Sequence, residues 1–455
     1  MKLKTVNLTN FRCFRNLKVE FDPRLTVFTA ANGHGKTTVL EAVKFALVSF
    51  VRRFPVTPKP PAPADDNIRT FLLPEVGDDE LQESPYFLIE AQAELAAERT
   101  LDWNVFIVNH RLSVSQKNEM RVGKVKTKDL GEYVDSLVDK RNGGMPIELP
   151  VVAYFGTQRA VVKQKVQRRR GFRSKLEYTD GYVGCLNADL DYKQILEWIE
   201  IFEKNEYDEC KRRSDISYRC LENRTIQFAL NKMLPELSNL RTKLNPYRLV
   251  VDACVANGSE DGGEIVPCRV DEYLSDGYRC VLMLVLNLIS RILKLNPHAY
   301  KTPEDVLACP GIVLIDEVDL HLHPSWQQRV LPDLLGVFKN VQFIVTTHSP
   351  QVVSTVPSRC VRKIENMRIS PVEVNTEGAV AGQMLTEVFG TSERPRNTEL
   401  SKDIERYRRM LDDGSWKSPE GERLWERLQH ALQTDPALAT LSVDRMMKDH
   451  GLGSR

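Results

Sequence analysis

The loop between residues 30 and 38, which reads AANGHGKTT, could bind a nucleotide through its phosphate groups. Small residues let such a loop approach an anion closely, and the backbone N–H groups at the start of a following helix then face the phosphate. Lys36 would bridge two phosphate groups, and the Thr37 hydroxyl would bind Mg²⁺. A turn that contains Gly-Lys-Thr by chance is the alternative, but apolar residues at helical spacing after Lys36 favour the nucleotide loop. The residues expected to contact the nucleotide are Asn32, Gly33, Gly35, Lys36, Thr37 and Thr38.

One residue of this loop departs from the pattern GxxxxGK[ST]. The pattern asks for glycine at its first position, where this chain has Ala30. If that position needs a positive φ, alanine costs on the order of 1 kcal/mol or reshapes the loop. We therefore expect nucleotide binding to survive and hydrolysis to be slow.

Two carboxylates, Asp316 and Glu317, follow the apolar run 312–315 in the segment GIVLIDEVDLHLHP. Four apolar residues are too few for a helix and are typical of a strand that is buried on both faces. Asp316 would hold Mg²⁺, directly or through water, and Glu317 would orient or activate the attacking water. Two acids could instead cap a helix, but the intact apolar strand before them makes this alternative the weaker one. The two distant stretches together predict nucleotide hydrolysis.

Two further motifs lie where a regular element ends or begins. His348 closes the apolar strand 341–347, from which its side chain could hydrogen-bond a phosphate group. Ser275 begins an apolar helix, and serine is both a good N-cap and a phosphate ligand at such a position. Because Lys36 already has its own helix N-terminus, Ser275 and Gly277 would serve a second nucleotide. The sequence therefore predicts a dimer that binds two nucleotides head to tail.

Three other sets of residues leave alternatives open. Gln158 follows a buried-strand candidate and could face the nucleotide. His321 and His323, with Asp319, could bind a metal, although a structural or interface role is favoured because no further ligand is near them in the sequence. The segment 159–175 has eight basic residues and no acidic one. This segment could bind a phosphate backbone or be a solvated loop.

The order of the predicted elements indicates an α/β fold with a mixed sheet. Strand-like runs lead into the loop at residue 30, and the short apolar runs 151–155, 312–315 and 341–347 predict a buried sheet. Five prolines between residues 54 and 64 predict an extended linker, and a charged stretch without glycine or proline at 185–234 predicts a helical lobe. The expected parts are a first head segment with the phosphate loop (1–50), a linker with a peripheral strand insertion (51–148), a strand with the basic segment (149–184), a helical lobe (185–245), a second head segment (246–365) and a helical C-terminal region (366–455).

Composition narrows the class of protein. The 455 residues suffice for two or three domains. The 63 Lys and Arg balance 62 Asp and Glu, so a global attraction to nucleic acid is excluded. The nine cysteines are scattered and never spaced as CxxC, which favours reduced thiols over disulfides or a zinc site. Because no run approaches the ~18 apolar residues of a membrane span, we expect a cytoplasmic protein without membrane contact.

Five motifs in this order resemble the ABC-type ATPase heads of the RecF and SMC class: NFRCF, ANGHGKTT, LSDG, LIDEVDLHLHP and TTHSP. The resemblance implies ATP and Mg²⁺ as cofactors and a P-loop NTPase head. It also implies a role for each matching residue, namely Lys36 and Thr37 in Walker A, Asp316 and Glu317 in Walker B, Ser275 and Gly277 in the signature, Asp319 in a dimer-contacting D-loop, His348 as the switch histidine, Arg12 near the nucleotide and Gln158 in a Q-loop that could reach the metal. Transporter signatures have glycine where this chain has Asp276.

More closely, LSDGYR, IDEVDLHLHPSWQ and FIVTTHSP resemble the compact PtuA ATPases of anti-phage Septu and retron-linked Septu systems. That resemblance implies a homodimer or higher homo-oligomer through the heads and an HNH nuclease partner. Contact with a reverse transcriptase, its msDNA or other DNA is a further option. The rival hypothesis is a RecF/SMC-like DNA-repair ATPase. An autonomous nuclease with a Toprim-like C-terminus is disfavoured because residues 351–455 contain no DxD motif.

Overall fold

The structure is a computed structural model, and it describes residues 1–72, 81–95, 99–121, 125–145, 147–160, 177–189, 192–255, 264–392, 394–434 and 438–450. The chain forms two compact units, Met1–Met384 and Leu385–Arg455. All of the residues expected to bind or hydrolyse a nucleotide lie in the first unit.

A six-stranded sheet forms the centre of the first unit, with the strand order β15-β14-β3-β13-β12-β8. All neighbouring pairs are parallel except β14 and β15. Every residue of β3, β8, β12 and β13 is buried, as expected for a parallel sheet covered on both faces. The strands are β3 (Leu25–Thr29), β8 (Val151–Phe155), β12 (Gly311–Ile315), β13 (Val341–Thr347), β14 (Val361–Glu365) and β15 (Arg368–Pro371).

The register of this sheet places the predicted motifs at one edge. Ile315 at the end of β12 pairs with Phe155 of β8 and with Val345 of β13. Thr347 at the end of β13 pairs with Thr29 at the end of β3. The loops that follow these four strands therefore emerge side by side.

Helix α1 (Lys36–Val51) lies between the six-stranded sheet and a second, antiparallel sheet of order β2-β1-β6-β7. Because α1 is covered on both sides, most of its residues are apolar and buried. The Trp103 indole of the antiparallel sheet donates a 3.0 Å hydrogen bond to the carbonyl of Ala46 in α1. Its strands are β1 (Lys2–Phe11), β2 (Phe14–Glu20), β6 (Tyr86–Glu94) and β7 (Thr100–Val108).

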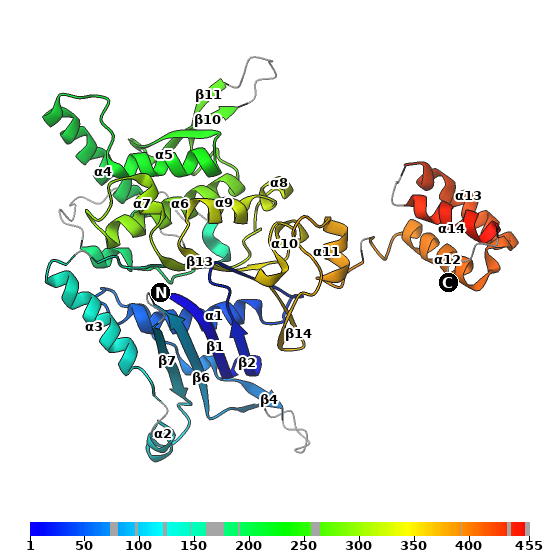
Figure 1. Ribbon diagram of the computed structural model, residues 1–455, viewed down its shortest axis with the longest axis horizontal. Helices are drawn as coiled ribbons and strands as arrows, with labels where there is room; N and C mark the ends of the chain where they lie inside the picture. The colour runs from blue at the N-terminus through cyan, green and yellow to red at the C-terminus, as the bar shows by residue number, and fades with distance from the viewer. Residues whose placement is uncertain are drawn as a thin grey trace. The chain divides into compact units, whose positions relative to one another are not determined.

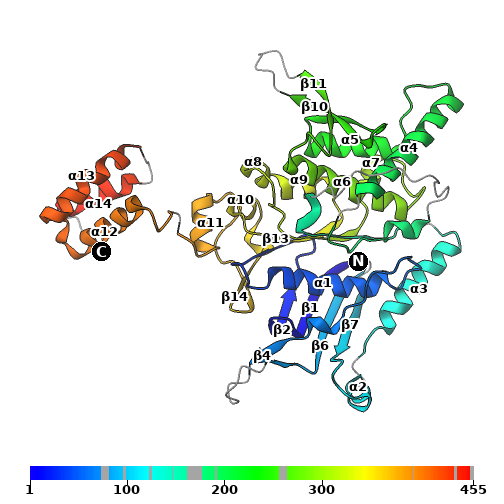
Figure 2. The same cartoon turned by 180° about the vertical axis from the view of Figure 1, so that it is seen from behind.

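In Figures 1 and 2, α2 and α3 lie on the same side of β13 as α1, whereas the helices α4 to α9 lie on the other side. Helix α6 (Asp276–Leu295) is the most buried of these and contacts β8, α4 and α5. A three-stranded antiparallel sheet of order β11-β10-β9 completes this helical lobe. Its elements are α4 (Tyr192–Arg213), α5 (Leu221–Met233), β9 (Leu237–Leu244), β10 (Tyr247–Val255), β11 (Glu264–Arg269), α6, α7 (Pro303–Leu307), α8 (Pro324–Gln327), α9 (Val330–Val337) and α10 (Pro350–Val353).

Short elements connect these layers. They are the 3₁₀ turns η1 (Asp65–Asn67), η3 (Thr157–Ala160), η4 (Tyr178–Gly181) and η5 (Ser358–Cys360), the strand pair β4 (Thr70–Leu72) and β5 (Leu81–Glu83), and the helices α2 (Val114–Arg121), α3 (Lys128–Asn142) and α11 (Ala381–Glu387). Within the described residues, no helix is both long enough and apolar enough to cross a membrane.

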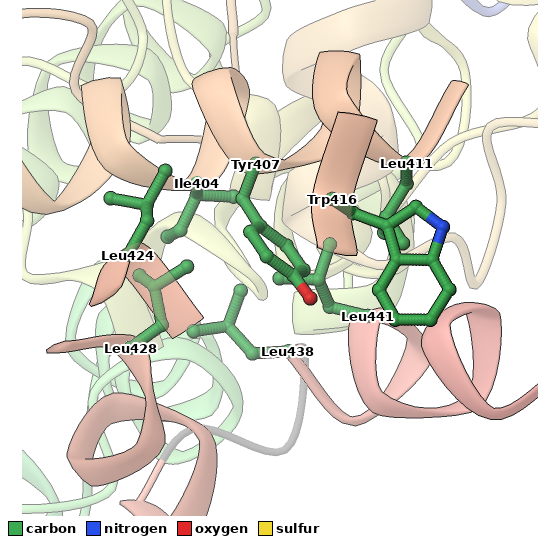
Figure 3. Close-up of a cluster of buried hydrophobic side chains, with 8 residues drawn as sticks. All are labelled: Ile404, Tyr407, Leu411, Trp416, Leu424, Leu428, Leu438 and Leu441. Carbon is green, nitrogen blue, oxygen red and sulfur yellow. The ribbon is translucent and has the colours of Figure 1, made fainter. Parts of the chain in front are cut away.

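The second unit is a helical bundle with its own core (Figure 3). Its elements are α12 (Glu399–Asp413), η6 (Ser415–Lys417), α13 (Pro419–Thr434) and α14 (Ala439–Asp449). The Arg445 guanidinium lies 4.5 Å from the Trp425 ring centre and donates to both oxygens of Glu422, which ties α14 to α13. The buried side chains of this core are Ile404, Tyr407, Leu411, Trp416, Leu424, Leu428, Leu438 and Leu441.

The predicted α/β fold with a mixed sheet is confirmed, and two segments differ from the sequence-based expectation. Strand β9 lies inside the range 185–245 that we expected to be helical, and β15 lies inside 366–455. The sequence of β9, LSNLRTKL, has no regular apolar alternation. Asn239 of this strand has a positive φ, and the pairing of β9 with β10 shifts register between Val250 and Asp252. The strands expected in the segment 51–148 include β6 and β7, which pair antiparallel with each other, and β6 also pairs with β1.

Candidate nucleotide-binding and hydrolysis site

The phosphate loop joins β3 to α1, and glycine is required at its last position. Gly35 has φ +93°, and a Cβ atom there would lie 2.6 Å from the Phe14 ring. Gly33 also has a positive φ of +78°. Ala30 is buried and is not among the described non-glycine residues with positive φ. The left-handed strain that could have slowed hydrolysis at position 30 is therefore absent.

The Lys36 ammonium group lies inside the phosphate loop. Its Nζ donates to the carbonyls of Ala30, at 2.8 Å, and Ala31, at 3.2 Å. Burial lowers the pKa of Lys36, and the carboxylates of Glu317, Asp316 and Asp319 oppose that shift. A cation held by carbonyls at the centre of a loop is placed to meet an incoming phosphate group.

Thr37 and Asp316 meet across 279 residues of sequence. The Thr37 Oγ1 donates a 3.2 Å hydrogen bond to Asp316 Oδ2. A hydroxyl and a carboxylate are hard oxygen donors of the kind that Mg²⁺ prefers, so Thr37 and Asp316 would hold the ion that neutralises the phosphate charge. The residues at this position therefore fit a nucleotide-bound Mg²⁺.

Thr346 holds both predicted Walker B carboxylate residues, and the sequence analysis did not identify it. Its buried hydroxyl donates to Asp316 Oδ1 at 2.6 Å and accepts from the backbone N–H of Glu317 at 2.7 Å. Glu317 has a φ of +48°, which is unusual for a residue with a side chain. Thr346 lies near the end of the apolar strand, two residues before His348. This position in the sequence could have indicated that Thr346 belongs to the site.

Asp319 of the predicted D-loop and His348, the predicted switch histidine, are also connected. Asp319 Oδ1 accepts from the Thr347 hydroxyl at 2.5 Å and from the His348 backbone N–H at 3.3 Å. Burial lowers the pKa of His348, and the neighbouring Lys36 charge lowers it further. A neutral imidazole near Lys36 can hydrogen-bond a phosphate oxygen. The phosphate-sensing role of His348 stays a prediction.

Among the residues singled out in the sequence, Arg159 lies in an environment that differs from the expected one. We assigned it to a basic segment that either binds DNA or is solvated, but it is 4% exposed. Its guanidinium donates to the carbonyl oxygens of Gly156 (3.2 Å), Asp316 (2.6 Å) and Glu317. Burial lowers the pKa of Arg159. The rest of the segment, including Arg168, Arg169 and Arg170, lies outside the described residues, whereas Gln158 is exposed on the same turn as Arg159.

Arg12 lies beside the start of α1. Its guanidinium donates to Glu41 of α1 at 2.6 Å and to the Asn67 side chain at 2.8 Å. Asn32 is exposed in the loop, and Thr38 follows Thr37 in the first turn of α1. The predicted nucleotide contact of Arg12 would therefore compete with its bond to Glu41.

The predicted signature residues lie at the N-terminus of α6. Ser275 is the N-cap and is exposed. A Cβ atom on Gly277 would lie 2.9 Å from the backbone oxygen of His321, so α6 closely approaches the predicted D-loop. The Nδ1 of His323 accepts from the Ser325 N–H and thereby caps α8, which supports the structural role favoured for this histidine.

The chain matches two family models, each described as an AAA domain. The first covers residues 5–245 and the second covers residues 248–354. The first range includes the phosphate loop, and the second includes Asp316, Glu317 and His348.

Three proteins with sequences similar to this chain belong to retron and Septu systems. The Retron Ec83 probable ATPase of Escherichia coli is 34% identical over 48% of this chain and 38% of its own length. The Retron Vc95 probable ATPase of Vibrio cholerae is 24% identical over 91% of this chain and 84% of its own length. The Septu protein PtuA of Bacillus thuringiensis is 28% identical over 31% of this chain and 37% of its own length. The predicted resemblance to ATPases of these systems is confirmed.

Among solved structures, an SMC head bound to the C-winged helix domain of ScpA is similar, with a TM-score of 0.44 and 14% identity over 83% of this chain and 98% of that chain. The fold assignment for this chain rests on its own strand order and on the matched domains. The chain therefore belongs to the AAA-domain family of ATPases.

Proposed function

We propose that this chain is the ATP-binding and ATP-hydrolysing regulatory subunit of a bacterial anti-phage defence complex. The observation that carries the proposal is the contact of Thr37 with Asp316, which joins the phosphate loop to the carboxylate strand. The similarity to retron ATPases and to a Septu protein supports the defence role.

Each residue of the site has a distinct task in this proposal. Lys36 binds and neutralises phosphate oxygens, while Thr37 and Asp316 hold Mg²⁺, which supplies further charge neutralisation. Glu317 orients or activates the attacking water, and His348 contacts the phosphate from the neighbouring strand. Little more is needed, because phosphoryl transfer depends mainly on positioning and charge.

We further propose that two heads dimerise and together control a separate effector nuclease of the HNH type. Ser275 is exposed at the N-terminus of a 20-residue helix, where it is free to approach a nucleotide held by another chain. The phosphate loop already uses the N-terminus of α1. A second chain is therefore the natural source of a nucleotide for Ser275.

Sedimentation velocity with ATP and Mg²⁺ tests the dimer directly. Glu317→Gln should bind ATP without turning it over and should accumulate as a dimer, whereas Lys36→Ala should stay in the state seen without nucleotide. Lys36→Ala that binds ATP and assembles like the wild type would overturn the proposal.

A further inference from the structure

Arg159 is a buried cation that binds only backbone oxygens in the part of the chain that the structure describes. Its three acceptors are the carbonyls of Gly156, Asp316 and Glu317. No described carboxylate forms an ion pair with it. Burying a charge is costly unless hydrogen bonds compensate it, so a guanidinium at this position needs all three carbonyls.

The backbone that Arg159 holds is strained. Glu317 has a φ of +48°, a conformation that residues with side chains keep only when their surroundings enforce it. Two groups enforce it from either side: the Thr346 hydroxyl accepts from the Glu317 N–H, and Arg159 donates to the Glu317 carbonyl. The same guanidinium holds the carbonyl of Asp316, one residue earlier.

Arg159 also connects this backbone to the neighbouring strand. It lies in η3, directly after β8, and its bond to Gly156 fixes the turn that carries Gln158. Strand β8 pairs with β12 up to Ile315, so the three carbonyls that accept from Arg159 follow the ends of two adjacent strands. The planar fork of arginine can reach several carbonyls at once, which a lysine ammonium cannot do in the same geometry.

We infer that Arg159 is a positioning residue for ATP hydrolysis: it holds Glu317 in the backbone conformation that aims its carboxylate at the attacking water. The inference rests on the proposed function, because it assigns to Glu317 the role of orienting that water. Arg159 itself touches neither the nucleotide nor the water.

The substitution Arg159→Lys keeps the charge and removes the fork. Arg291→Lys is the matched control. Arg291 lies in α6 and also donates to two backbone carbonyls, those of Gly181 and Val183. Arg159→Lys should lower kcat roughly tenfold to a hundredfold, as expected when a catalytic group is misplaced by about 1 Å. Its affinity for ATP should stay near that of the wild type, since Lys36 and Thr37 are unchanged.

A second measurement needs no nucleotide. Amide hydrogen exchange at residues 316–318 should be faster in Arg159→Lys than in the wild type and unchanged in Arg291→Lys. If Arg159→Lys fails to fold, Arg159→Gln, whose shorter side chain has a single NH₂ group and cannot reach all three carbonyls, should show the same two effects. A wild type that does not hydrolyse ATP would refute the proposed function. The exchange experiment would then still decide whether Arg159 holds the backbone of Asp316 and Glu317.

A double variant separates positioning from general damage. Because Arg159 acts through Glu317, adding Arg159→Lys to Glu317→Gln should not lower the residual turnover further. A folded Arg159 variant with the kcat and the amide exchange of the wild type would overturn the inference. A double variant with a lower turnover than Glu317→Gln alone would also overturn it.

Discussion

At the scale of single residues, the site depends on side chains that hold the backbone as much as on those expected to react. The sequence pattern identified Lys36, Thr37, Asp316 and Glu317, since each belongs to a short motif with a known chemical reason. It did not identify Thr346 or place Arg159 correctly, because their hydrogen bonds to Asp316 and Glu317 span 29 to 158 residues. Such long-range hydrogen bonds leave no local pattern.

Thr346→Val tests the shared hydroxyl. The substitution keeps the shape of the side chain but leaves the Glu317 N–H without its hydrogen-bond partner. An unsatisfied buried donor lowers the free energy of unfolding by about 1–3 kcal/mol. We expect turnover to fall roughly tenfold to a hundredfold, because Asp316 and Glu317 both lose their orientation. Steady-state phosphate release measures the turnover, and a separate ATP-binding measurement shows whether the affinity for ATP has changed.

Thr346→Ser is the control for this prediction, because it retains the hydroxyl and loses only a methyl group. It should hydrolyse ATP much faster than Thr346→Val. Equal turnover in the two variants would show that the hydroxyl has no positioning role.

At the scale of elements, the apolar runs predicted the central strands well. The expected strands 151–155, 312–315 and 341–347 agree with β8, β12 and β13, since strands buried on both faces show as short continuous apolar runs. The order of the strands could not be predicted, because the intervening position of β13 between β3 and β12 depends on tertiary contacts. Strand β9 was missed because its sequence, LSNLRTKL, lacks the apolar alternation that indicates a strand.

The packing of α6 on the D-loop gives a prediction at this scale. Gly277→Ala would place a Cβ atom 2.9 Å from the backbone oxygen of His321, so the helix or the loop must move. We expect a loss of about 1–3 kcal/mol in the free energy of unfolding, which is typical of overpacking. Thermal unfolding of the purified protein measures it.

Gly336→Ala in α9 is the matched control. A Cβ atom there meets nothing within 4 Å, and alanine is favoured over glycine inside a helix by roughly 0.5–1 kcal/mol. This variant should be as stable as the wild type or slightly more so. If Gly277→Ala unfolds at the same temperature as Gly336→Ala, the close approach of α6 to the predicted D-loop is contradicted.

At the scale of the whole molecule, one sheet assembles an ATPase site from motifs about 280 residues apart. The first unit contains every residue of that site, and the second unit has a separate helical core. Composition alone could exclude a strongly basic nucleic-acid binder, but neither the division into units at Met384 nor the burial of Arg159 follows from composition. Both depend on which apolar surfaces and hydrogen-bonding groups meet in the folded chain.

The central claim is that the phosphate loop and the carboxylate strand form one hydrolytic site. Phosphate release from ATP and Mg²⁺ by the wild type and by Glu317→Gln, measured beside ATP affinity, tests this claim most directly. We predict that Glu317→Gln binds ATP like the wild type and turns it over at least about a hundredfold more slowly, as expected when a group that activates water is lost. Wild-type turnover in Glu317→Gln would contradict it.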